Sequence, residues 1–448
     1  MRKNGKHAPG VPAERLPSSM RTFGVIWFGQ LISTLGSGLT GFALSVYIYQ
    51  ETGSATQLGV AMLATVLPSL LVSPLAGALV DRWDRRWVMI ASDAGAALST
   101  LVIWALLSAG QLQVWHIYVA NVVSSALGSF QQPAYMASIT LLVPKQHLGR
   151  ASGLGQLSDA LSRILAPTLA GFLVVTIQVQ GVILIDFVTF LFAVGTLLAV
   201  RIPRPEVTEE GRAGRGSLLR ESAFGWIYIK ARPGLLWMLI LFACINLALG
   251  FQNVLFTPLI LSFSTPAAMG AILSAGGAGL FAGSLLMSTW GGTRNKIYGL
   301  IGGLFLLGLF SGISGLRPSP LLIGAANVCM FAVVPIVNGS GQAIWQAKVA
   351  PDVQGRVFAT RRLIAMIAMP ISYLAAGPLA DRVFEPLMAE GGAWAAVLGP
   401  ILGTGPGRGI GLVFVIVGSI VALLAVAGYL NPRIRKIDGE LPDYALAG

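Results

Sequence analysis

Long apolar runs, separated by short charged or glycine-rich segments, dominate this sequence. We count twelve such runs, each of about 20 residues or more, the length that a helix needs to cross a hydrocarbon core of about 30 Å. Hydrophobic residues make up 55% of the 448 residues and charged residues 11%, whereas an average soluble domain carries about 25% charge. The sequence therefore predicts an all-α membrane protein with twelve transmembrane helices.

The positive charge of the chain is concentrated in connecting segments and tails. A net charge of +12 on a soluble protein would suggest nucleic acid as a partner. Here most lysines and arginines fall in both tails and in alternate connections, which marks these segments as cytoplasmic. We predict a multi-pass protein of the cell (inner or plasma) membrane, with both termini in the cytoplasm, contacts to anionic lipid headgroups and no nucleic-acid partner.

The sequence contains none of the common catalytic or nucleotide-binding motifs. There is no His-Glu-x-x-His, no Gly-x-Ser-x-Gly and no Gly-x-x-x-x-Gly-Lys pattern. The three histidines, His7, His116 and His147, lie in a tail or at the edges of apolar runs. We expect no cofactor and no metal, and a membrane-embedded enzyme stays a remote alternative.

Two segments about half a chain apart repeat one pattern. Residues 143–150 and 349–356 have the same length, an early proline and a Gly-Arg ending. Their offset of about half the chain length indicates an internal duplication. The predicted parts are a cytoplasmic tail at 1–21, a six-helix bundle at 22–200, a cytoplasmic linker with an amphipathic helix at 201–233, a second six-helix bundle at 234–430 and a cytoplasmic tail at 431–448.

One connection, residues 77–86, is unusually dense in charge. Five of its ten residues are charged, and each charge would cost about 2.5–3.5 kcal/mol at the centre of a bilayer. We therefore predict a water-exposed hinge on the cytoplasmic side, between the second and third helices. On this evidence alone the segment could also be a solvated loop that only fixes orientation.

Polar residues inside the apolar runs are the candidates for a binding site. In the first run, Gln30, Thr34 and Ser37 accompany small residues, which predicts either one face of a polar central cavity or close helix packing. Amides and one aromatic residue in later runs could grip an amphipathic ligand or could hold helices together. These further candidates are Gln131, Asn246, Gln342 and Trp345.

Two charged residues, Asp159 and Arg163, lie four positions apart on one helical face. At 1.5 Å per residue they lie about 13 Å and about 19 Å from Arg150 at the cytoplasmic edge. Charges at such depth usually mark a substrate or proton path, although a self-neutralised structural pair is the alternative. For two other acids we expect a structural ion pair near the interface (Asp93) and an interfacial position near the outer end of a helix (Asp186).

The pattern Gly-x-Leu-x-Asp-Arg-x-x-Arg-Arg at residues 77–86 resembles the loop between helices 2 and 3 of the major facilitator superfamily of transporters. In that family the acid pairs across to the other half of the protein and steadies one access state. The resemblance implies the two-bundle major facilitator fold. It also implies a gating role for Gly77, Asp81, Arg82, Arg85 and Arg86.

Further stretches resemble particular branches of the superfamily. Residues 166–171 are similar to the Gly-Pro-x-x-Gly-Gly element of its antiporters, with Pro167 and Gly171 kept and alanine at the first and fifth positions. Residues 29–37, 132–138 and 354–359 resemble the bacterial branch of macrolide efflux proteins and the enterobactin exporter. This resemblance implies a carrier that exports an amphipathic drug or secondary metabolite (a macrolide, a siderophore or a peptide-like product) in exchange for protons. We expect the carrier to be a monomer. A lipid or lysolipid translocator of the same fold is the alternative.

Overall fold

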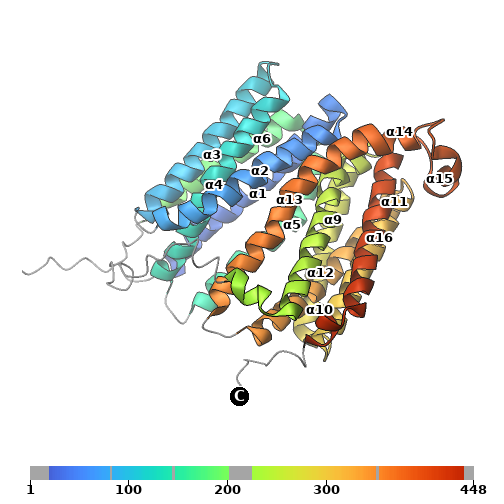
Figure 1. Cartoon of the computed structure of the whole chain (residues 1–448). Coiled ribbons are helices and arrows are strands. Elements are labelled where there is room, and N and C mark those ends of the chain that lie inside the picture. The colour runs from blue at the N-terminus through green and yellow to red at the C-terminus, as the bar shows by residue number, and fades with distance from the viewer. Residues whose placement is uncertain (1–19, 81–82, 144–146, 201–224, 350–352, 438–448) are drawn as a thin grey trace, which may run out of the picture.

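The computed structural model describes residues 20–80, 83–143, 147–200, 225–349 and 353–437 (Figure 1). Most of both predicted tails and of the predicted linker at 201–233 lies outside these ranges. Within them the chain is helical and contains no strand. This is the all-α membrane protein that the apolar runs predict.

The first group of helices packs together on one side of the molecule (Figure 1). Its contacts run between α1 and α5, α1 and α6, α2 and α4, α3 and α4, and α3 and α6. The helices of this group are α1 (Met20–Thr52), α2 (Ala55–Val80), α3 (Arg85–Ser108), α4 (Val114–Leu142), α5 (Leu148–Thr176) and α6 (Gln178–Ala199).

The second group contains six long helices and four short elements. It contacts the first group chiefly where α10 packs along α5 and α13 packs along α2. Its elements are α9 (Pro233–Leu261), α10 (Pro266–Trp290), α11 (Lys296–Leu316), α12 (Pro320–Lys348), α13 (Gln354–Leu379), the π-helical turn η3 (Ala380–Phe384), α14 (Glu385–Met388), α15 (Ala395–Leu402), α16 (Arg408–Leu430) and α17 (Pro432–Arg435).

Twelve long helices match the predicted number of membrane spans, although only ten of them are apolar enough to qualify by length and composition. The other two are α4 and α5. In α4, polar residues such as Asn121, Ser124 and Gln131 lower the hydropathy. In α5 the described apolar part is the shorter segment Ala160–Thr176.

Local sequence signals explain where several helices begin. The carboxylate of Asp84 caps α3 by accepting a hydrogen bond from the Arg86 backbone N–H at 3.0 Å. Thr265 and Ser319 cap α10 and α12 in the same way, and each is followed by proline at the first helical position. These caps satisfy backbone donors that the helix itself leaves free.

The two ends of the molecule differ in charge. Helices α3, α9 and α11 begin at one end, beside Arg85, Arg232 and Lys296. We call this end the basic face. The opposite face carries the turn between α1 and α2 together with α14 and α15. The glycine-rich stretch 384–409 on this face is partly helical. Its helix α15 is tied to the bundle by the Arg317 guanidinium, which donates to the Pro400 carbonyl oxygen at 3.2 Å.

Helices α11 and α16 touch through small residues. A Cβ atom added to Gly418 would lie 2.3 Å from the Gly312 backbone nitrogen and 2.5 Å from the Gly308 carbonyl oxygen. In a bilayer, helix association depends on such close packing, because lipid tails are as apolar as the helices themselves. Gly418 therefore fixes the distance between these two helices.

We expect the substitution Gly418→Val to destabilise the protein by about 1–3 kcal/mol, the usual cost of overpacking a close contact. Gly302→Val on α11 is the matched control, because a Cβ at Gly302 meets no atom within 4 Å and the residue is exposed. Thermal unfolding in detergent, followed by the loss of the monodisperse size-exclusion peak, measures the difference. Equal melting temperatures for the two variants would contradict this account of the α11–α16 contact.

Candidate functional site

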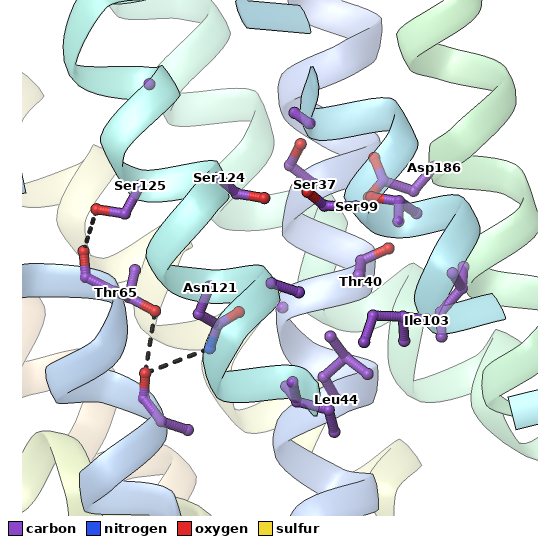
Figure 2. A pocket seen from close by; sticks show the side chains of 18 of the residues that line it. Ser37, Thr40, Leu44, Thr65, Ser99, Ile103, Asn121, Ser124, Ser125 and Asp186 are labelled. Carbon is purple, nitrogen blue, oxygen red and sulfur yellow. Dashed lines mark hydrogen bonds between the residues drawn. The ribbon is translucent and has the colours of Figure 1, made fainter. Parts of the chain in front are cut away.

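Side chains from α1, α2, α3, α4 and α6, joined by Tyr373 of α13, enclose a cavity of about 610 Å³. We call it the N-terminal cavity, and Figure 2 shows part of its wall. Among the described residues that line it, none is Lys, Arg or His, and two are Asp. Its main polar lining residues are Gln30, Ser33, Thr34, Ser37, Thr40, Ser92, Asp93, Ser99, Asn121, Ser124, Ser125, Gln131 and Asp186.

The first carboxyl group of the cavity, that of Asp93 on α3, is held by amides from two other helices. Asp93 is 5% exposed and accepts a hydrogen bond from Gln30 Nε2 at 2.9 Å. Gln131 Nε2 donates in turn to Gln30 Oε1 at 2.5 Å. The chain Gln131–Gln30–Asp93 therefore joins α4, α1 and α3 along one wall of the cavity.

The prediction of an ion pair for Asp93 was wrong. Its hydrogen-bond partner in the described chain is the Gln30 amide, and it faces the cavity instead of the membrane interface. Arg86 on the same helix turns away and donates to the carbonyl oxygens of Leu197 and Leu198 at 2.9 and 2.7 Å. These carbonyls end α6, where a cation is favoured by the helix dipole.

The second carboxyl group, Asp186 on α6, lies against α1. It is 2% exposed, and Thr189 Oγ1 donates to its Oδ1 at 3.4 Å. Ser37 and Thr40 of α1 lie beside it in Figure 2. The approach is possible because Gly36 has no side chain: a Cβ there would lie 2.8 Å from Asp186 Oδ1.

The predicted interfacial position of Asp186 was also wrong. Helix α6 begins at Gln178, so Asp186 lies about 12 Å along the helix, where it is buried and lines the cavity. Both cavity carboxyl groups therefore face the interior of the helix bundle. The structure also brings together four residues that the sequence singled out: Gln30, Thr34, Ser37 and Gln131 all line this cavity.

A second cavity, of about 700 Å³, lies among α9, α11, α12 and α13. We call it the C-terminal cavity. Asn246, Gln342 and Trp345, which the sequence proposed for contact with an amphipathic ligand, all line it. Asn246 Nδ2 donates to the Ala365 carbonyl oxygen at 3.4 Å, and Trp345 is 1% exposed. Arg361 also lines this cavity, and sequence reasoning gave it no role.

The described part of the charged pair on α5 lines neither cavity. Arg163 is exposed and lines neither the N-terminal nor the C-terminal cavity. The Asp159 backbone belongs to α5, and its side chain lies outside the described part of the structure. A role for this pair in substrate or proton movement stays a prediction.

The proline-containing segment of α5 packs directly on α10. A Cβ on Gly270 would lie 2.2 Å from the Pro167 carbonyl oxygen and 3.3 Å from the Gly171 Cα. One turn further along α10, the Ser274 hydroxyl donates to the Ile164 carbonyl oxygen and accepts from the Thr168 backbone N–H at 3.1 Å. Ser274 therefore supplies polar contacts beside the place where Pro167 cannot donate to the helix.

The charged connection at 77–86 is only partly described. Gly77 lies in α2, and Asp81 and Arg82 lie outside the described residues. Arg85 Nη1 donates to the Ala137 carbonyl oxygen of α4 at 2.9 Å. Together with the bonds of Arg86 to the end of α6, this ties α3 to its neighbours at the basic face. The gating role of these five residues stays a prediction.

At the opposite face, Asp381 of η3 joins the two helix groups. Its carboxylate accepts hydrogen bonds from the backbone N–H groups of Ala55 and Thr56, at 3.1 and 2.9 Å, and from the hydroxyls of Ser54 and Thr56, both at 2.7 Å. A carboxylate at a helix N-terminus is favoured by the free donors and by the helix dipole. Asp381 thus caps α2 from the second group of helices.

We expect Asp381→Asn to weaken this closure, because hydrogen bonds to a charged acceptor are worth about 1.5–3 kcal/mol. Spin labels at the exposed positions Gln50 and Glu390, in a background without Cys244 and Cys329, report the separation of the groups by pulsed electron resonance. The variant should populate longer distances than the parent. Arg382→Gln, which changes an exposed neighbour, is the control; identical distance distributions for Asp381→Asn and the parent would contradict the assignment.

These cavities inside a bundle of apolar helices define a multi-pass membrane transporter. The family model of the Major Facilitator Superfamily matches residues 26–373, and the chain belongs to this superfamily. It is a transporter of the cell membrane and not an enzyme.

Named relatives and solved structures agree with this assignment. Macrolide efflux protein A of Streptococcus pyogenes is 27% identical over 420 residues, covering 93% of this chain and 97% of the relative. Multidrug efflux pump Tap of Mycolicibacterium fortuitum is 24% identical over 430 residues, covering 92% and 96%. A bacterial homolog of the human lysosomal transporter Spinster, solved in an inward-facing conformation, has a similar fold, with a TM-score of 0.69, 14% identity and coverage of 94% and 99%.

Proposed function

We propose that this transporter is a proton-coupled antiporter that exports an amphipathic drug or secondary metabolite by alternating access. The observation that carries the proposal is the pair of buried carboxyl groups, Asp93 and Asp186, in a cavity with no described basic residue. The names of the efflux relatives support an exported small molecule, with a macrolide as the first substrate to test. Siderophores and peptide-like products belong to the same proposed class.

The chemistry of the cavity suits an exchange of protons for substrate. A carboxylate buried in the membrane without a nearby cation is costly. That cost is removed when the group binds a proton or when a positively charged group enters the cavity beside it. A substrate with a positively charged amine would therefore compete with a proton for the same carboxylates. Competition of this kind couples inward proton movement to outward transport.

Alternating access is supported by where the two helix groups touch. Asp381 joins them at the opposite face, and Ser274 and Gly270 join them along α5. We propose that residues 22–200 and 234–430 move as two bundles on the linker 201–233, and that the charged connection at 77–86 holds the basic face closed in the other state. The positive-inside pattern supports a cytoplasmic basic face with both termini inside. We propose a monomer as the transporting unit.

We expect Asp93→Asn and Asp186→Asn each to lower macrolide-driven proton movement by at least about tenfold, because each removes a proton-binding group from the membrane interior. The assay uses purified protein in liposomes that contain a pH-sensitive dye, with erythromycin as the added substrate. Glu390→Gln removes an exposed carboxyl group at the opposite face and should leave the signal unchanged. Full proton movement in both cavity variants would refute proton coupling through these residues.

We also expect Arg163→Ala and Asp159→Asn to abolish export while expression stays normal, if the α5 pair belongs to the transport path. Growth of a drug-sensitive host on erythromycin measures export, and a blot of the membrane fraction measures expression. Export at the parental rate in both variants would assign the pair to structure alone. Movement of a fluorescent lysolipid, with no protection against the macrolide, would instead favour the lipid translocator.

A further inference from the structure

The C-terminal cavity contains a guanidinium group whose charge the described chain does not balance. Arg361 lies seven positions into α13, about 10 Å from the start of the helix. Its Nη2 donates to Gln342 Oε1 at 3.1 Å. Its Nη1 is buried and has no hydrogen-bond partner. None of the described residues that line the cavity is Asp or Glu.

Aromatic rings shape the space around this cation. The Arg361 Cζ lies 5.2 Å from the centroid of the Trp345 ring and 5.7 Å from that of Phe358. Cation–π contacts at these distances offset part of the cost of burying the charge. They give no acceptor to the Nη1 donors, and an unpaired buried donor on a charged group costs more than about 1–3 kcal/mol. Among the described residues, the site therefore lacks an acceptor for these donors.

We propose that the C-terminal cavity binds an organic anion, with its carboxylate or phosphate on Arg361 and its apolar body along Trp345 and Phe242. Gln342 also lines the cavity, and because its Oε1 accepts from Arg361, its Nε2 is the group that it can offer as a donor to a ligand. The apolar lining residues, among them Leu249 and Leu304, match the hydrocarbon or ring part of such a molecule. A guanidinium is suited to both acid groups because its donors lie in a planar fork.

The two cavities then differ in the sign of the group that they accept. The N-terminal cavity presents carboxylates, whereas the C-terminal cavity presents a guanidinium. This inference rests on the proposed function in one respect. If the protein is an exporter, amphipathic acids and zwitterions belong to the molecules that it exports. Binding of the anion itself does not depend on proton coupling, so the two proposals can fail separately.

The binding test uses the full chain in nanodiscs of phosphatidylcholine and two brominated probes of equal length, 11-bromoundecanoate and 11-bromoundecanol. Bromine quenches nearby tryptophan fluorescence, and the Trp345→Phe variant identifies the part of the signal that comes from this cavity. We expect saturable quenching of Trp345 by the acid, with the alcohol at least about tenfold weaker, because it forms no charge-assisted hydrogen bond.

Substitutions at arginine give the matched comparison. Arg361→Gln should weaken binding of the acid by at least about tenfold, and Arg361→Lys should weaken it less because the charge remains. Arg294→Gln, at an exposed position on the basic face, should bind as the parent does. Equal affinity of the parent and Arg361→Gln for the acid, or equal affinity of the parent for acid and alcohol, would overturn the proposal.

A second series separates the two sources of the anion. Nanodiscs with rising fractions of phosphatidylglycerol offer the phosphate of a lipid headgroup. The negative surface raises the apparent dissociation constant of 11-bromoundecanoate in every variant. If a lipid occupies the site, this constant rises more steeply in the parent than in Arg361→Gln. If free acids occupy it, the constant rises by the same factor in both. Loss of proton movement in the liposome assay would leave either result intact, so a failure of the proposed antiport is distinguishable.

Discussion

The cost of placing polar groups in hydrocarbon is the constraint on which the rest of this structure depends. It favours an apolar lipid-facing surface and directs the polar side chains of the two cavities toward a neighbouring helix or into the cavity. Asp93 and Asp186 are therefore both buried and both cavity-lining. The same constraint explains why α4, which supplies many hydroxyls and amides to the cavity, is less apolar than its neighbours. The polar cavity and the apolar outer surface both follow from the cost of placing polar groups in hydrocarbon.

Small residues determine how closely the helices approach one another. Gly36 lets Asp186 approach α1, and Gly270 lets α10 approach α5 at Pro167. These contacts join helices that are distant in sequence, and they decide which side chains share a cavity. The arrangement of charge follows from them: carboxylates gather among the first six helices, and Arg361 lies among the later ones. The two cavities therefore differ in the charge that they present to a ligand.

Much of the fold and part of the site could be predicted from the sequence. The apolar runs predicted the long helices, and the polar positions of the first run placed Gln30, Thr34 and Ser37 on a cavity wall. The cavity positions of Asp93 and Asp186 were missed because hydropathy shows neither the depth of a residue nor the direction in which its side chain points. The contact of Arg361 with Gln342 and Trp345 depends on how α12 and α13 pack. No local pattern encodes such packing.

The Ser274 hydroxyl has a consequence for how the carrier moves. It serves the backbone of α5 from a helix in the other group, beside a proline that leaves that backbone short of a donor. If the proposed alternating access separates the groups there, Ile164 and Thr168 lose this partner, and water can take its place. Separation at α5 would then also wet this part of the helix. A carrier built this way should respond to agents that withdraw water from its crevices as well as to its substrates.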